Sequence, residues 1–152
     1  MTPEPTRGRA APILVAHGTR SLAGVDTIGR IAALVGQRIG QTRVAFVDVL
    51  GPTPSELLRE NLDRPTVLVP AFLSRGYHVS RDIPSHVEQS EHPHVTVTRA
   101  LGPDPALVRV LVERLIESGW RPDDSVILAA AGTSDPVAMR DLHTTATWLS
   151  AT

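Results

Sequence analysis

Short apolar runs rich in β-branched residues recur along the chain, separated by longer stretches that mix polar and apolar positions. The runs lie at residues 12–16, 43–49, 66–73, 94–101 and 125–131. Nearly continuous apolar runs of this length are typical of strands that are covered on both faces. We therefore predict a strand in each run.

The stretches between the runs show helical spacing. The apolar stripes are Leu22, Val25, Ala32, Val35 and Ile39 in one segment and Leu107, Leu111 and Leu115, widened by Val108 and Val112, in another. Shorter helices are predicted at 54–61 and 83–90, and a last one from about 135 to 149. Asp82 fits the N-cap position of the helix at 83–90. Strands that alternate with helices predict an α/β fold, a doubly wound parallel sheet with helices on both faces.

The last predicted strand repeats the first. Residues 13–19 (ILVAHGT) and 127–133 (ILAAAGT) are identical at five of seven positions, and each copy leads into a predicted helix. Chance is the alternative explanation for matches in so short an apolar segment. Ala131 stands where the first copy has His17, so any chemistry that needs this histidine belongs to the first copy.

This repeat predicts the domain organisation. We expect a flexible N-terminal tail at residues 1–11 and one α/β domain at 12–120. Residues 121–152 would form the opening strand and helix of an incomplete second unit. A chain of 152 residues is long enough to bury a core of this kind.

Composition narrows the classes of partner. The net charge of −1 argues against broad electrostatic binding of nucleic acid, and no apolar stretch is long enough to span a bilayer. Cysteine is absent, which fits a cytoplasmic protein and excludes thiolate metal sites. The basic residues number 15 and all are arginine. Arginine binds carboxylates in a bidentate manner, which would suit a polyanionic substrate; codon bias is the alternative explanation.

Two histidines follow predicted strands. His17 comes directly after the first run, and His78 follows the third run after a short polar segment. The carboxyl ends of parallel strands meet at one edge of a sheet, where open α/β sheets bind ligands. Two neutral imidazoles at that edge can hold a divalent transition metal or transfer protons near neutral pH. Gly18 would leave room there for a close approach of a ligand.

Four segments around these histidines resemble the small class II tetrapyrrole chelatases, the sirohydrochlorin cobalto- and ferrochelatases of the CbiX/SirB type. The segments are 17–20 (HGTR), 70–79 (PAFLSRGYHV), 82–84 (DIP) and 100–103 (ALGP), within a resemblance that covers about residues 12 to 118. The resemblance implies a chelatase-like fold and insertion of Co2+ or Fe2+ into sirohydrochlorin, with no organic cofactor and no nucleotide hydrolysis. It also implies that His17 and His78 handle the metal. The shortest members are single halves that dimerise, so a homodimer is expected.

Further site residues follow from the same segments. Sirohydrochlorin is a polycarboxylate, so nearby arginines are candidates for binding it, although each could equally be an ordinary surface residue. The substrate-binding candidates are Arg20, Ser74, Arg75, Gly76, Tyr77 and Arg81. Asp48, in a Phe-x-acid pattern where the family often has Glu, is a candidate proton acceptor or metal-path carboxylate. A role in capping a loop or helix is its alternative.

Three further histidines, His86, His92 and His94, are expected to be solvated loop residues rather than a metal-loading site. The leading hypothesis is therefore a cytoplasmic chelatase acting on a tetrapyrrole, with no nucleic-acid or membrane partner. A non-catalytic module that binds and delivers metal or tetrapyrrole is the alternative. A fragment that folds only with a missing C-terminal partner is a third possibility.

Overall fold

Four parallel strands form the centre of the fold. The computed structural model describes residues 10–151. The strands are β1 (Ala11–Ala16), β2 (Arg43–Phe46), β3 (Thr66–Pro70) and β4 (Val95–Val97), in the spatial order β2-β1-β3-β4. Helices connect them, and every neighbouring pair runs parallel. The predicted α/β class with a parallel sheet is confirmed.

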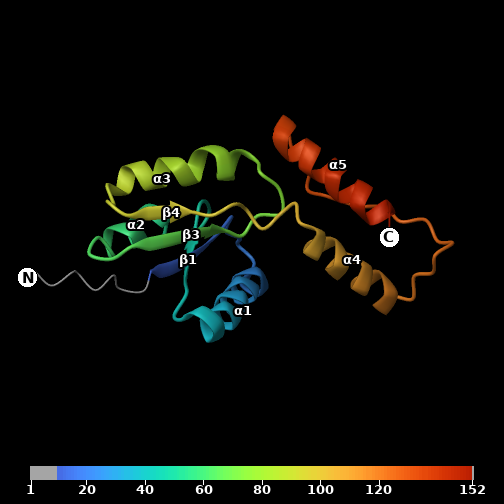
Figure 1. Cartoon of the computed structure of the whole chain (residues 1–152), viewed down its shortest axis with the longest axis horizontal. Helices are drawn as coiled ribbons and strands as arrows, with labels where there is room; N and C mark the ends of the chain where they lie inside the picture. Colours follow the sequence, from blue (N-terminus) through green and yellow to red (C-terminus); the bar gives the residue numbers. More distant parts are fainter. Residues whose placement is uncertain (1–9, 152) are drawn as a thin grey trace, which may run out of the picture.

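Helices cover both faces of this sheet. Helix α1 (Leu22–Ile39) lies on one face, while α2 (Pro54–Arg59) and α3 (Ile83–Ser90) lie on the other (Figure 1). The main core fills the space between the sheet, α2 and α3, and consists of Ile13, Val15, Ala45, Leu57, Leu58, Leu68 and Ile83. A π-helical turn, η1 (His78–Asp82), leads directly into α3.

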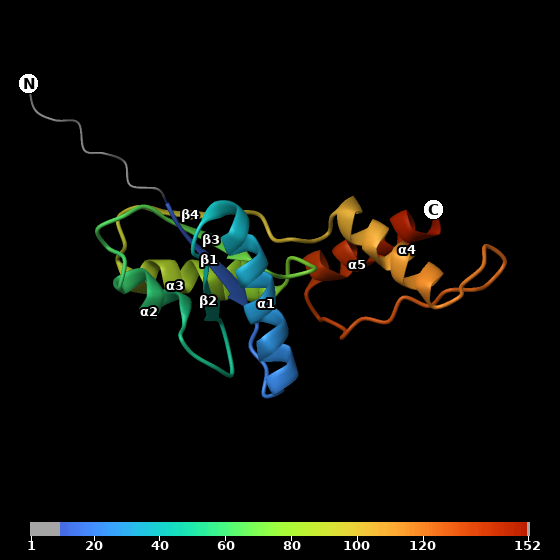
Figure 2. The ribbon, with the colours of Figure 1, turned by 90° about the horizontal axis from the view of Figure 1, so that it is seen from below.

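The two remaining helices stand beside the sheet rather than on it. Helix α4 (Pro105–Glu117) follows β4, and α5 (Pro136–Ser150) packs against α4 (Figures 1 and 2). Both helices begin at a capping aspartate followed by proline, with Asp104 accepting a backbone hydrogen bond at α4 and Asp135 accepting two at α5. Such caps satisfy the free N–H groups of a first helical turn.

The predicted strands at 43–49, 66–73 and 94–101 are shorter in the structure. The chain leaves the regular ladder but keeps bonding to its neighbours, as in Asp48 N–H to the His17 carbonyl (3.0 Å) and Leu101 N–H to the Pro70 carbonyl (3.1 Å). The residues after each strand therefore form loops that are fastened to one another at the carboxyl edge. The expected tail at 1–11 lies outside the described residues up to residue 9, and β1 already begins at Ala11.

The strand predicted at 125–131 is wrong. These residues form neither strand nor helix and are mostly exposed, with Ile127 at 91%. In β1 the matching residue, Ile13, is 1% exposed because strands flank it on both sides. Within residues 10–151 no strand lies beside 125–131, so its backbone has no ladder to join. The helix predicted after it is confirmed as α5.

Candidate metal-handling site

The two predicted histidines meet at the carboxyl edge of the sheet. The ring centroids of His17 and His78 lie 4.5 Å apart, with the planes at 88°, so the edge of one imidazole faces the other. His17 directly follows β1, whereas His78 opens η1 after the loop of residues 71–77. The loop lets a residue far beyond the end of β3 return to the end of β1. The sequence prediction that both histidines share this edge is confirmed.

Both Nδ1 atoms have acceptor partners. Nδ1 of His17 lies 3.1 Å from the carbonyl oxygen of Gly18, and Nδ1 of His78 lies 2.5 Å from Oδ2 of Asp82. A carbonyl or carboxylate oxygen can only accept, so each Nδ1 carries the hydrogen of the neutral ring. The lone pair then resides on each Nε2, which is the atom left available for a metal or a proton.

Asp82 does not cap α3, contrary to the sequence prediction. Its backbone is already helical and its side chain makes no capping hydrogen bond, because η1 continues into α3 without a break. The carboxylate instead turns back one helical turn to His78. A π-helical turn inside a longer helix is frequently found at functional sites. Asp82 is thus a site residue whose role the sequence did not reveal.

Aromatic rings border His78 on two further sides. Phe72 stacks against it with centroids 6.0 Å apart at 26°, and Tyr77 presents an edge at 6.3 Å and 83°. Phe72 also packs against the main core, so this contact ties the imidazole to the body of the fold. Tyr77 is 62% exposed, which leaves its ring available to a ligand.

Gly18 allows the loop after β2 to lie directly against the segment that follows His17. Its φ is +101°, and a Cβ at this position would lie 2.0 Å from the carbonyl oxygen of Asp48. The Asp48 carboxylate accepts from the N–H of Val49 at 2.7 Å, within its own turn. Among residues 10–151 no three His, Asp or Glu side chains gather as a metal-binding group. The site therefore offers two imidazoles, and the backbone of Asp48 lies next to His17 and Gly18.

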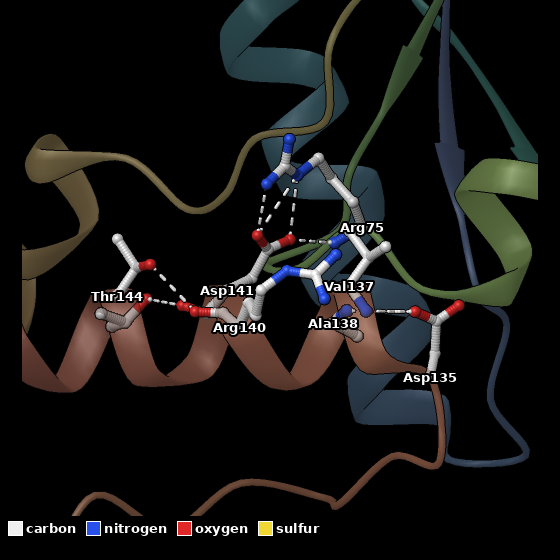
Figure 3. Close-up of polar contacts among 8 residues, drawn as sticks. Arg75, Asp135, Val137, Ala138, Arg140, Asp141 and Thr144 are labelled. Atoms are coloured by element: carbon white, nitrogen blue, oxygen red, sulfur yellow. Dashed lines mark hydrogen bonds and ion pairs between the residues drawn. The ribbon is translucent and has the colours of Figure 1, made fainter.

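The candidate substrate-binding residues take different positions. Arg75 forms a bidentate ion pair with Asp141 of α5 (Figure 3). Gly76 lies close to Ala138 of the same helix. Arg20, Arg81 and Tyr77 are exposed, and Ser74 is half-buried. Asp141 is 1% exposed and could not be found from sequence, because it lies 66 residues from its partner.

Not all of the remaining histidines are solvated. His92 is buried, with Nε2 2.8 Å from the Asn61 carbonyl oxygen and Nδ1 accepting from the N–H of His94 at 3.0 Å. His86 is half-buried against the hydroxyl of Ser55, and burial lowers its pKa. The expectation of solvated loop residues is correct for the exposed His94. It is wrong for His92, whose ring is buried in the turn before β4, and for His86, which is half-buried on α3.

One hollow in the structure lies away from the histidines. An apolar groove of about 880 Å³ runs between α4, α5 and residues 120–128, and neither His17 nor His78 lines it. The candidate site is therefore identified by its chemistry rather than by its volume. No helix within residues 10–151 combines the length and the apolar character needed to cross a membrane.

Comparison with known proteins gives a consistent result. The CbiX family model matches residues 11–118. A sirohydrochlorin ferrochelatase of Priestia megaterium is 27% identical over 144 residues, covering 88% of this chain and 54% of that protein. A sirohydrochlorin cobaltochelatase of Sulfurisphaera tokodaii is 25% identical over 108 residues, covering 69% and 90%. The chain thus spans about half the length of the Priestia relative and most of the Sulfurisphaera relative.

Two solved structures share the fold. SirB from Bacillus subtilis, determined with Fe3+, superposes with a TM-score of 0.81 at 21% identity, covering 94% of this chain and 61% of that chain. A CbiX protein from Marinobacter aquaeolei, described as a putative cobalamin biosynthesis protein, gives a TM-score of 0.59 at 23% identity, covering 72% and 98%. The chelatase-like fold is confirmed.

Proposed function

The chain belongs to the CbiX family, and we propose that it inserts Co2+ or Fe2+ into sirohydrochlorin with His17 and His78 at the metal. The observation that carries this proposal is the pair of imidazoles whose centroids lie 4.5 Å apart at the sheet edge. The names of the relatives from Priestia and Sulfurisphaera support the substrate and both metals.

Two imidazole ligands suit an ion that must be passed on. Nitrogen ligands accept either Co2+ or Fe2+, and two protein ligands leave the other coordination positions to water or to the incoming pyrrole nitrogens. A closed site with four protein ligands would instead retain its ion. The edge-to-face arrangement brings both rings to one small region, from which the ion enters one face of the macrocycle.

Insertion also releases protons. The free-base macrocycle loses two pyrrolic protons as the divalent ion forms its bonds to the four nitrogens, so the macrocycle exchanges two N–H bonds for metal bonds. His17 and His78 regain free Nε2 lone pairs as the metal leaves them, and these lone pairs accept the two protons before solvent removes them. Asp48, in the adjacent loop, is a candidate to receive a proton in turn. This scheme uses no organic cofactor.

The polycarboxylate substrate needs cations around the site. We propose that Arg20 and Arg81, which are exposed and follow His17 and His78 closely in the sequence, bind its carboxylates together with the half-exposed side chain of Arg75. Ser74 is proposed as a further hydrogen-bond donor. The exposed ring of Tyr77 offers a surface for the macrocycle, and Gly76 keeps the loop close to α5.

The test is an anaerobic insertion assay that follows the absorption of sirohydrochlorin with Co2+ or Fe2+ against the uncatalysed rate. His17→Ala and His78→Ala are each expected to remove most of the acceleration. His143→Ala is the matched control, because this histidine is exposed on α5. Unchanged rates in both site variants would refute the site assignment.

A delivery module is the second candidate function. Within residues 10–151 the site has only the two imidazoles and no cluster of three possible metal ligands. Such a site would equally suit a protein that carries a metal or tetrapyrrole to another protein. Binding of sirohydrochlorin without acceleration of metal insertion would support this function and contradict the chelatase.

We propose a homodimer as the working form. Large apolar side chains are strongly exposed on two parts of the chain, among them Leu22 (87%), Leu34 (61%), Ile116 (60%) and Ile127 (91%). The open groove beside residues 120–128 adds to this unpartnered surface. Sedimentation equilibrium of the full chain at micromolar concentration should give twice the monomer mass, and a monomer would contradict the proposal.

The location we propose is the cytoplasm, supported by the absence of cysteine. We propose no nucleic-acid or membrane partner, since the net charge is −1. Fractionation of cells that express the chain tests the location, and recovery in a membrane or secreted fraction would contradict it.

A further inference from the structure

A buried carboxylate in α5 binds the loop that leads to His78. Asp141 is 1% exposed, and its Oδ2 accepts the backbone N–H of Arg75 at 2.7 Å. The Arg75 side chain donates from Nε to Oδ2 at 3.0 Å and from Nη2 to Oδ1 at 2.6 Å (Figure 3). Both oxygens of the carboxylate are thus used by one residue, through its main chain and its side chain together.

This arrangement fixes the position of the loop. A buried carboxylate is costly unless it is fully paired, and a bidentate guanidinium pair with an added backbone bond has only one geometry. The same pairing lowers the pKa of Asp141, so the carboxylate stays ionised. A second contact also holds the loop against α5: a Cβ on Gly76 would lie 3.6 Å from the Cβ of the buried Ala138.

The loop is held at its other end by the sheet. Ala71 N–H bonds to the Val15 carbonyl at 2.7 Å, and Gly102 N–H bonds to the Phe72 carbonyl at 2.9 Å. The backbone of Leu73 is packed against Gly102, and the bonds from Arg75 to Asp141 then tie the next part of the loop to α5 before η1 begins at His78. Asp141 lies outside residues 11–118, the part of the chain that the CbiX family model matches.

We propose that Asp141 is a positioning residue: through Arg75 it holds the 71–77 loop so that His78 faces His17. Helix α5, which follows the matched CbiX region, would therefore contribute to the site at the sheet edge by holding this loop, without placing a histidine there. The functional consequence of this arrangement rests on the proposed metal chemistry at His17 and His78. The anchoring of the 71–77 loop by Asp141 does not depend on that chemistry.

The experiment measures metal binding and local opening in the same variants. Asp141→Asn keeps the size of the side chain but removes its charge. It should weaken Co2+ binding to the full chain by about 10-fold, the lower end of the range for partners of metal ligands. Amide hydrogen exchange at residues 72–78 should become faster, while exchange in β1 and β3 stays unchanged. Arg75→Gln should act alike, and the double variant should add little, since the two residues act through one contact.

Glu117→Gln is the matched control, because Glu117 forms an exposed ion pair with Arg114 on α4, away from the histidines. If Asp141→Asn does not fold, Arg75→Lys removes the bidentate geometry while keeping the charge. Faster exchange confined to residues 136–150, with unchanged Co2+ affinity, would show that Asp141 only docks α5 and would overturn the proposal. If the wild type shows no chelatase activity, while Asp141→Asn has the predicted effects on Co2+ binding and hydrogen exchange, the proposed function is refuted and the positioning role stands.

Discussion

Asp82 holds His78 in one orientation: its Oδ2 lies 2.5 Å from Nδ1 of the imidazole, four residues earlier on the continuous helix formed by η1 and α3. A carboxylate behind an imidazole fixes the tautomer and makes the opposite nitrogen a better ligand. Both partners are about 30% exposed, with side-chain values of 31% and 28%. The contact should therefore act on Nε2, the proposed ligand atom, rather than on the packing of the core.

Asp82→Asn should weaken Co2+ binding roughly 10- to 100-fold, because the amide is a poorer acceptor for the Nδ1 hydrogen. A titration that follows the visible absorption of bound Co2+ measures the change. Glu88→Gln, at an exposed position of α3, should leave the affinity unchanged. Equal affinity in Asp82→Asn and in the wild type would show that the carboxylate does not act on the ligand.

Gly18→Ala should destabilise the fold by about 2–4 kcal/mol, since it combines a positive φ with a severe clash. The new Cβ would lie 2.0 Å from the carbonyl oxygen of Asp48, which is backbone and cannot swing away. Urea unfolding gives the change in the free energy of unfolding. Gly29→Ala in α1 is the control: apart from its chain neighbours and its own helix backbone, no atom lies within 4 Å of the added Cβ, so it should stabilise by about 0.5–1 kcal/mol. A loss below about 1 kcal/mol for Gly18→Ala would contradict the close approach.

His86 should make stability depend on pH in the weakly acidic range. Burial lowers its pKa in the folded state, with Asp82 and Glu56 opposing this effect, so the folded protein keeps it neutral. The unfolded chain takes up a proton as the pH falls below about 6.5, and the folded chain takes it up later. The stability contributed above that pH is thus lost on acidification. The free energy of unfolding of the wild type, relative to His86→Gln, should fall between about pH 7 and 5; a constant difference would contradict the prediction.

Strand patterns and residue order were enough to predict the sheet and to place His17 and His78 at one edge of it. Runs of buried β-branched residues specify strands wherever neighbouring strands are present, as for β1, and strand ends in a parallel sheet share an edge. That rule alone brought His17 and His78 together. The same reasoning failed at 125–131, because a strand needs partners that a local pattern cannot supply.

The contacts that hold the site residues in place could not be predicted from the sequence, because they depend on how distant segments pack in three dimensions. Asp82 looked like a cap because it precedes a proline-containing helix, and only the continuous turn η1 redirects its side chain to His78. Asp141 pairs with Arg75 across 66 residues, a contact that depends on where α5 packs. His92 looked like a loop residue beside Pro93, yet its ring fills a buried turn.

Ile127→Asp should dissociate the proposed homodimer. Ile127 is 91% exposed, although its counterpart in the repeat, Ile13, is 1% exposed within the sheet. If a second copy covers this segment, each Ile127 buried at the interface contributes about 1.5–3 kcal/mol. Removing both would weaken the dimer by at least ~100-fold, because each 1.4 kcal/mol is a factor of ten. Leu62→Asp is the control, since this exposed leucine lies in the turn after α2, and Figure 1 shows this turn at the opposite end of the molecule from residues 120–128. Sedimentation equilibrium should find monomer for Ile127→Asp and dimer for Leu62→Asp, whereas dimers of equal strength in both would exclude residues 125–131 from the interface.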